Sequence, residues 1–427
     1  MNPVNAMINA PEGMGQINTK NSIKEVNETN KNRIIDVVKR NNPLSRAEIS
    51  RLLNLSKPAV SENVNKLLET GLIIELGPAR NAAGRKATLL ALNAGYAYLI
   101  GADIGNFKLR VALSDLSGDI KDKREELLVP DIESGELVAL LDSSIEKILA
   151  GNKVPPEKLL ALCIGIPGVY DERQKKNLFV PYIRGFEDFD LAAHYKARYA
   201  GLCIINNNIN LAALGEKRAR ADKENDYKNM VYINMGIGIG AGIILNGELF
   251  TGLNGTAGEI AYGCFGDMPV KKKFTKEGTF EHAVSTRRLI INYNSASGNR
   301  LPLNSIDSML YILRRHEHGE PAARGVIDEL LYNIKLLLIN VTAFYAPDII
   351  IFGGGLGEEI SVYFPEIRKV LANNVPYPPD LSLAKCGPYS GIYGAIAEAK
   401  RIATADYRTV CGIINRGFFN VYTAASG

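Results

Sequence analysis

The sequence has little of what disulfide frameworks, metal centres and membrane spans require. Its cysteines are scattered and form no C-x-x-C pair, which favours reduced thiols over a disulfide framework or a metal site. No run of about 18 apolar residues occurs, so we expect no membrane span. Residues 1–25 are polar and lack the charged-then-apolar order of a secretory signal, and we expect a disordered leader there. Together these absences predict a cytoplasmic protein.

Charge is unevenly distributed along the 427 residues, which are enough for two or three domains. The formal net charge is only +4, yet residues 26–93 hold eleven Lys or Arg against six Asp or Glu. The rest of the chain is close to neutral. This asymmetry favours a small basic module joined to a larger neutral one, although a solvated helical surface would produce the same local charge.

Residues 26–93 follow the pattern of a winged helix-turn-helix. After one amphipathic helix, Ser45 and Glu48 form the pattern of a capping box at a second helix start. Ser56 is a suitable N-cap for a third helix, whose Val60, Val64 and Leu67 recur at spacings of four and three and should face inward. The opposite face is small and polar, which suits insertion into the major groove of DNA.

Two strands around a Gly-rich, Arg-bearing tip follow these helices and predict the wing. Basic side chains there can reach phosphates or a minor groove. We expect this module to contact double-stranded operator DNA, and a helical protein–protein adaptor is the alternative. The candidate DNA contacts are Arg46, Ser56, Lys57, Ser61, Asn65, Arg80, Arg85 and Lys86.

From residue 94 to residue 403 apolar strand-like runs alternate with helical stretches, which is the α/β pattern. Gly-rich turns follow several of these runs, and such turns let backbone amides approach phosphates or hydroxyls closely. Any one of them could equally be an ordinary tight connection. The last segment, residues 404–427, contains no motif that we can interpret, and its role stays open.

Five segments carry a family resemblance. They read "ADIGNFKLRVALSDLSG", "GIPGVYD", "NNNINLAALGE", "GIGIGAGIILNGELFTGLNGTAGEIAYG" and "PDIIIFGGGLG". In order and spacing they resemble the ROK family of transcriptional repressors and sugar kinases, and the resemblance covers roughly Val26 to Lys400. It implies an α/β, two-lobed, actin-like (ribonuclease H-like) ATPase-type domain. With a DNA-binding module in front, the chain most resembles the xylose-repressor branch of that family.

The chain departs from the kinases of this family where catalysis takes place. The phosphate turn D-x-G-G-T reads Asp103-Ile104-Gly105-Asn106-Phe107, without its second Gly and its Thr. A second turn, G-T-G in the kinases, has Ile237 in place of the hydroxyl residue. The N-D-A-N motif has Asn208 where its Asp would deprotonate the sugar, and an amide has no useful basicity near neutral pH. We therefore expect no catalytic residue and no ATP binding.

The sugar-binding positions of the family are better preserved. By resemblance, the candidate sugar contacts are Gly168, Asn207, Asn208, Glu259, Tyr262 and Glu281. Family members also hold a structural zinc with one His and three Cys, and this chain has Tyr262 for the His and only Cys264 from the cysteine run. Four-coordinate zinc needs donors that are missing here, so we predict no zinc and no other cofactor.

These patterns predict a sugar-responsive transcriptional repressor that binds a xylose- or glucose-like monosaccharide in a catalytically inactive domain. A homodimer would place two recognition helices on a palindromic operator, and sugar binding would shift the population of domain arrangements. Two alternatives remain from the sequence. One is an active ATP-dependent sugar kinase that carries a DNA-binding module, and the other is a scaffold without a small ligand.

Overall fold

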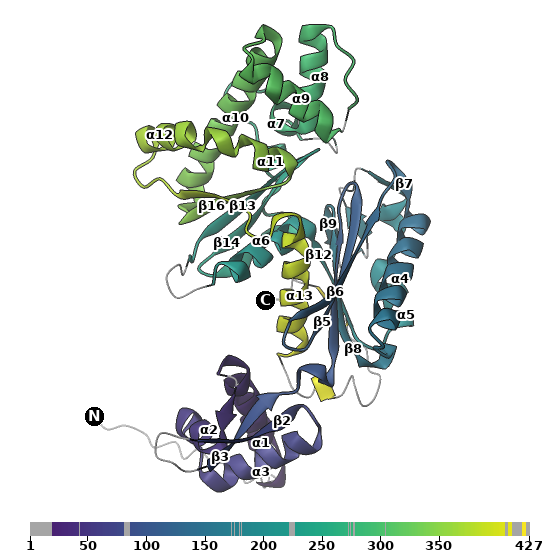
Figure 1. Ribbon diagram of the computed structural model, residues 1–427, viewed down its shortest axis with the longest axis vertical. Coiled ribbons are helices and arrows are strands. Elements are labelled where there is room, and N and C mark those ends of the chain that lie inside the picture. The colour runs from purple at the N-terminus through teal and green to yellow at the C-terminus, as the bar shows by residue number, and fades with distance from the viewer. Residues whose placement is uncertain are drawn as a thin grey trace, which may run out of the picture. The chain divides into compact units, whose positions relative to one another are not determined.

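The computed structural model describes residues 19–41, 43–80, 86–171, 173–174, 176–178, 180, 182–221, 227–271, 273, 275, 278–303, 305–405, 409–411 and 421–423. The chain divides into two compact units, Met1–Asn93 and Ala94–Gly427. Figure 1 labels the elements of both units. Each unit is described by itself below.

The first unit is a winged helix-turn-helix, as predicted. It contains α1 (Thr19–Arg40), β1 (Leu44–Ser45), α2 (Arg46–Leu53), α3 (Lys57–Glu69), β2 (Ile73–Arg80) and β3 (Lys86–Leu92). The strands form a sheet in the order β1-β3-β2, in which β2 and β3 make the antiparallel wing hairpin. Residues 81–85, with Arg85 at the expected tip, lie outside the described part of the chain.

Local sequence explains where these helices begin. The Ser45 hydroxyl accepts a hydrogen bond from the Glu48 N–H while the Glu48 carboxylate accepts one from the Ser45 N–H, so the predicted capping box is present. Ser56 caps α3 through the N–H of Ala59, at 3.3 Å. Val60, Val64 and Leu67 are fully buried, as the spacing predicted. Burial of this face leaves the other face of α3 open to solvent.

The second unit contains two sheets, and each belongs to one lobe. The first lobe has a sheet in the order β18-β12-β8-β4-β5-β6. Its helices α4 and α5 pack on one face and α13 on the other (Figure 1). The elements of this lobe are β4 (Tyr98–Ile104), β5 (Lys108–Asp115), β6 (Ile120–Leu127), α4 (Ser134–Gly151), β8 (Leu159–Ile166), α5 (Leu191–Arg198), β12 (Leu202–Asn207), α13 (Ser390–Ala403) and β18 (Val421–Thr423).

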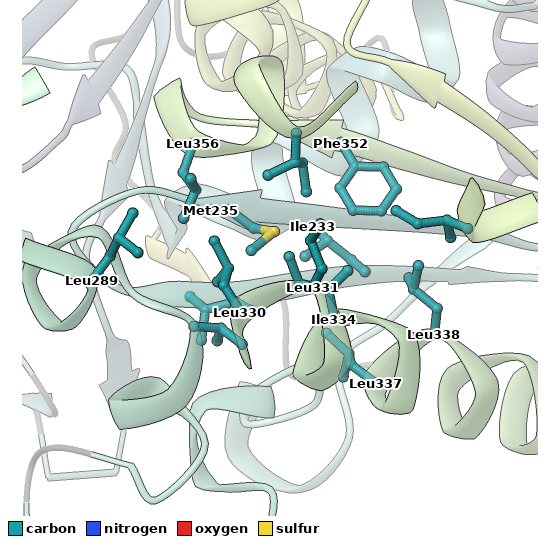
Figure 2. Packing of buried hydrophobic residues seen from close by; sticks show 14 of the residues in the cluster. Ile233, Met235, Leu289, Leu330, Leu331, Ile334, Leu337, Leu338, Phe352 and Leu356 are labelled. Atoms are coloured by element: carbon teal, nitrogen blue, oxygen red, sulfur yellow. The ribbon is translucent and has the colours of Figure 1, made fainter. Parts of the chain in front are cut away.

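The second lobe has a sheet in the order β15-β14-β13-β16-β17. Its core lies where apolar residues of α10 pack against β13 and β16, as Figure 2 shows for Leu331, Ile334 and Phe352. Its elements are α6 (Asn208–Ala219), β13 (Met230–Met235), β14 (Ile239–Leu245), β15 (Glu248–Phe250), α7 (Glu281–Val284), α8 (Thr286–Ser297), α9 (Ile306–Glu317), α10 (Pro321–Tyr345), β16 (Ile349–Gly353), α11 (Gly355–Glu359), α12 (Phe364–Asn374) and β17 (Asp380–Leu383).

Short elements complete the unit. The strands are β7 (Ile132–Glu133), β9 (Val169–Asp171), β10 (Lys176–Leu178) and β11 (Ile183–Arg184). The 3₁₀ helices are η1 (Ala94–Tyr96), η2 (Pro156–Lys158), η3 (Phe186–Asp188), η4 (Leu253–Gly255), η5 (Ile260–Tyr262), η6 (Ile360–Tyr363) and η7 (Gly387–Tyr389). Among the described residues, no helix combines the length and apolarity needed to cross a membrane.

Two helices cross between the lobes. Helix α6 packs on β13 and β14 of the second lobe, while α13 packs on β4 and β8 of the first (Figure 1). Their backbones touch at two glycines: a Cβ on Gly215 would lie 2.1 Å from the Ser390 carbonyl oxygen, and one on Gly394 would lie 1.7 Å from the Leu211 carbonyl oxygen. Only glycine permits this approach, so the crossing is a close-packed joint between the lobes.

Candidate functional site

A cleft of about 520 Å³ lies in the second unit, between the ends of the two sheets. The elements β12, α6, η5 and α7 all contribute lining residues to it. The six residues that the family resemblance marked for sugar all line this one cleft: Gly168, Asn207, Asn208, Glu259, Tyr262 and Glu281. Residues more than 110 positions apart in sequence are therefore brought together at what we call the sugar end of the cleft.

Three of these side chains form an acidic group at the sugar end. Burial, and then the charge of Glu281, raise the pKa of Glu259 above its ordinary value. Burial, followed by the charges of both glutamates, raises the pKa of Tyr262 to about 12. The described residues offer the half-buried Glu259 carboxylate no hydrogen-bond donor. A carboxylate held in that state is suited to accept hydrogen bonds from a ligand's hydroxyls.

Asn207, predicted to contact sugar, is also the N-cap residue of a helix. It is the N-cap of α6, and its Oδ1 accepts hydrogen bonds from the N–H groups of Ile209 and Asn210, at 2.8 and 3.0 Å. Its Nδ2 donates to the carbonyl oxygen of Gly168, at 2.9 Å. Since an amide oxygen has two lone pairs and both are used, only one N–H of this side chain remains for a ligand.

Asn208 makes a bond that an aspartate could not make. Its Nδ2 donates to the carbonyl oxygen of Ile104, at 3.0 Å. Ile104 is the last residue of β4 and directly precedes the Gly105-Asn106-Phe107 turn. The amide therefore ties the start of α6 to the first lobe at the phosphate turn. A carboxylate at this position would place a negative oxygen against a carbonyl oxygen, which repels it.

The other end of the cleft, which we call the phosphate end, is internally paired. The Arg110 guanidinium lies 3.7 Å from the Asp103 carboxylate and donates from Nε to Glu125, at 2.9 Å. Burial nevertheless raises the pKa of Asp103 to about 6, partly offset by Arg110. A Cβ on Gly391 would lie 2.9 Å from the Asp103 carboxyl carbon, so α13 begins directly against this group. Asn106 lines the cleft and Phe107 is 39% exposed beside it.

Several cleft residues were not found from the sequence. Arg110, Tyr182, Glu358 and Ser390 line the cleft from four separate segments. Arg110 had a usable signal, because it lies within the first of the five motifs, and in the structure it pairs in register with Asp103 across β4 and β5. The other three lie outside the five motifs, so only the tertiary structure places them there.

The structure gives no basis for a metal centre at the position of the family's zinc. Cys264 is exposed and its Sγ donates to the Met268 carbonyl oxygen, at 3.2 Å. Among the described residues, no three His, Cys, Asp or Glu side chains cluster in a way that could hold a metal ion. The described residues do not fit a four-ligand zinc site.

The candidate DNA contacts on the helices of the first unit have different surroundings. Lys57 and Asn65 are exposed and Ser61 is half-buried on the solvent face of α3. Arg46 forms an ion pair with Glu75, at 3.0 Å, and its Nη2 donates to the Asn65 oxygen, at 3.3 Å. Arg46 therefore links α2 to α3 and to the wing. The backbones of Arg80 and Lys86 pair in register at the described ends of β2 and β3.

Fold and site define a class of protein: a DNA-binding winged helix-turn-helix joined to a two-lobed, actin-like domain with a ligand cleft. Residues 99–402 match the ROK family and residues 32–81 match the MarR family. The chain belongs to the ROK family.

Individual relatives agree with this assignment. The chain is 30% identical to the xylose repressor of Bacillus subtilis (strain 168), over 82% of this chain and 88% of that protein. It is 25% identical to a putative xylose repressor of Caldicellulosiruptor sp. (strain Rt8B.4), over 81% and 88%. Among solved structures, it matches a ROK family transcriptional regulator, a homolog of the Escherichia coli MLC protein. The TM-score is 0.71 and the identity 20%, over 91% of this chain and 99% of that one.

Proposed function

We propose that this protein is a sugar-responsive transcriptional repressor whose second unit binds a monosaccharide without phosphorylating it. The observation that carries the proposal is the half-buried Glu259 carboxylate, which faces the cleft beside Glu281 and has no donor among the described residues. Vicinal sugar hydroxyls supply the donors that such a carboxylate requires. The named relatives are xylose repressors, which supports a pentose or a similar hexose as the ligand.

Loss of kinase chemistry follows from the same cleft. Asn208 occupies the position of the catalytic base, and its amide is committed to the Ile104 carbonyl. At the phosphate end Arg110 is already paired with Asp103 and Glu125, so this cation is not free to neutralise a phosphate. Both features support binding without phosphoryl transfer, and ATP binding is not expected.

The DNA-binding role is assigned to the solvent face of α3, with Lys57 for phosphate and Ser61 and Asn65 for base edges. We assign Ser56 to a backbone contact at the helix start, and Arg80, Arg85 and Lys86 to phosphates beside the wing. Arg46 would have to exchange its bond to Glu75 for a phosphate. A homodimer would present two such helices to a palindromic operator.

Fluorescence anisotropy tests this function with a DNA duplex selected in vitro by the wild-type protein. D-xylose and D-glucose are titrated into the protein–DNA complex at fixed salt, because phosphate contacts make the affinity depend on salt. We expect one of the two sugars to change the DNA Kd by about 5- to 150-fold, the usual range of allosteric coupling. A DNA affinity that ignores both sugars would contradict the proposal.

An assay of phosphoryl transfer separates the repressor from the kinase alternative. The purified protein is incubated with MgATP and each sugar, and ADP release is followed by a coupled enzyme assay. We expect no sugar-dependent release. Turnover of about 1 per second or more, as in ordinary enzymes, would favour the kinase.

A further inference from the structure

The turn between β5 and β6, residues 115–119, lies at the end of its sheet that is remote from the cleft. Strand β5 begins after the phosphate turn at the cleft and ends at Asp115, which pairs with Tyr98 at the start of β4. The turn is tightly built: the Gly118 N–H donates to the Asp115 carbonyl at 2.9 Å, and Gly118 has a φ of +84°. Strand β5 is eight residues long, roughly 25 Å of extended chain, and connects the cleft to the turn.

Both helices of the interlobe crossing end on this turn. At the end of α6, the Arg218 guanidinium covers Gly118, because a Cβ built on that glycine would lie 3.1 Å from both terminal nitrogens. Near the end of α13, Lys400 Nζ donates to the Ser117 carbonyl oxygen, at 2.6 Å. The first turns of the same helices line the cleft with Asn208 and Ser390. Each helix therefore connects the cleft to residues 115–119.

The 115–119 turn is hydrogen-bonded to Ala94, the first residue of the second unit. The N–H of the fully buried Leu116 donates to the Ala94 carbonyl oxygen, at 3.0 Å. Ala94 is the first residue of the second unit, and only Asn93 separates it from the wing strand β3. If the turn moved, it would therefore move Ala94 and, through the peptide bond, the neighbouring Asn93.

Asn93 is fastened to the segment that follows helix α3. Its N–H donates to the Leu72 carbonyl oxygen at 2.9 Å, and its side-chain amide donates to the Gly71 carbonyl oxygen at 2.8 Å. Gly71 and Leu72 come directly after the C-cap of α3. Every step from the cleft to the base of α3 is thus a covalent bond, a hydrogen bond or a packed helix.

We propose that the 115–119 turn is the coupling element through which sugar in the cleft changes the position of helix α3. This inference rests on the proposed function. Closely packed helices slide or rotate as units and do not deform continuously, so a change in the angle between the lobes moves the ends of α6 and α13 on the turn. The Leu116–Ala94 hydrogen bond passes that displacement to Asn93.

The test compares two neighbouring substitutions on α13. Lys400→Met removes the bond to Ser117 and keeps a long aliphatic chain, while Arg401→Met removes a cation that pairs with Glu398 on the same helix. The DNA Kd is measured without and with saturating D-xylose or D-glucose, and the sugar Kd is measured by calorimetry. The ratio of the two DNA Kd values is the coupling factor.

We expect Lys400→Met to keep the sugar Kd and the sugar-free DNA Kd but to reduce the coupling factor about 2- to 30-fold, the range for residues that act between sites. Arg401→Met should keep the wild-type factor. An unchanged sugar Kd shows that the fold is intact. If Lys400→Met no longer binds sugar, the same measurements are made on Arg218→Gln, which removes the guanidinium that covers Gly118. Wild-type coupling in a variant that still binds sugar overturns the inference. A wild type without coupling to either sugar overturns the proposed function, and the inference with it.

Discussion

The charged groups at the two ends of the cleft differ in their hydrogen bonding. At the sugar end the Glu259 carboxylate has no donor among the described residues, and Glu281 lies close enough to raise its pKa. At the phosphate end Arg110 is paired within the protein with Asp103 and Glu125, and Asn208 at the sugar end donates to the Ile104 carbonyl oxygen beside the phosphate turn. The sugar end therefore keeps one carboxylate, that of Glu259, to which a ligand can donate, while the charged groups at the phosphate end pair with one another.

This difference separates binding from catalysis in physical terms. A buried polar group without a partner costs free energy, and a ligand that pairs with it recovers that cost. A group already paired inside the protein offers a ligand nothing without first breaking a bond. Under the proposed function, the cleft would therefore bind sugar hydroxyls and would not bind phosphates.

The largest effect is expected where α6 and α13 cross, because both helices also line the cleft and separating them would disturb both of its ends. Gly394→Ala places a methyl group where a Cβ would lie 1.7 Å from the Leu211 carbonyl oxygen, so α6 and α13 must separate. We expect a loss of about 3 kcal/mol or more in unfolding free energy, measured by urea denaturation. Gly325→Ala on α10 is the matched control, since nothing lies within 4 Å of that Cβ. Similar stabilities of the two variants would refute the close crossing.

Asp103 tests the pairing at the phosphate end through pH. Because burial raises its pKa to about 6, the folded protein holds this proton more tightly than the unfolded chain. The stability that protonated Asp103 contributes is present below about pH 4 and is lost as the pH rises to about 6. Asp103→Asn removes this dependence. Between pH 4 and pH 7 the variant should gain up to about 3 kcal/mol relative to wild type in unfolding free energy. A constant difference across that range would show that Asp103 is not held in this environment.

Glu259 tests the sugar end. Glu259→Gln removes the charge that strengthens its hydrogen bonds to the ligand, which are worth about 1.5–3 kcal/mol, so the sugar Kd should rise about 10- to 150-fold. Glu358→Gln provides the matched control, because Glu358 is an exposed carboxylate that lines the same cleft from α11. Calorimetric titration of D-xylose or D-glucose measures both. If the two substitutions raised the sugar Kd equally, Glu259 would have no special role in sugar binding.

Asn208→Asp is expected to have the smallest effect, and it tests one hydrogen bond, the one from Asn208 to the Ile104 carbonyl oxygen. The new carboxylate would lie where Nδ2 now donates to the Ile104 carbonyl at 3.0 Å, and we expect a cost of about 1–3 kcal/mol at pH 7. The pKa of the introduced acid should rise, so the cost should shrink as the pH falls towards 4 and the protonated acid donates again. Thermal denaturation at both pH values measures this. The variant should also remain inactive with MgATP, and restored sugar phosphorylation would show that only this residue had been lost.

Much of the fold could be predicted from local sequence. Ser45, Glu48 and Ser56 act over three or four residues, so the capping pattern placed α2 and α3 correctly. The five motifs predicted the two-lobed domain through their resemblance to the ROK family, and the domain has that fold. Segments without such a motif were not predictable: Val421–Thr423 pairs with β12 as strand β18, a contact across more than 200 residues.

The candidate site was predictable in its composition but not in its internal bonds. Sequence position places Asn207 and Asn208 at the start of α6, yet it does not show which hydrogen bonds their amides make. Asn207 turned out to be the helix cap, and Asn208 a link to the other side of the cleft. Both partners, Gly168 and Ile104, are backbone carbonyls, which carry no signature in the sequence. Such bonds emerge only from the tertiary structure.

The most direct test of the central claim titrates both ends of the cleft in one protein by calorimetry. D-xylose or D-glucose is titrated first, and MgATP is then titrated into the sugar-saturated protein. The account predicts saturable heat from one of the sugars, no saturable heat from MgATP, and a sugar Kd that is the same with and without MgATP. Saturable binding of MgATP, or a sugar Kd that depends on it, would contradict the account.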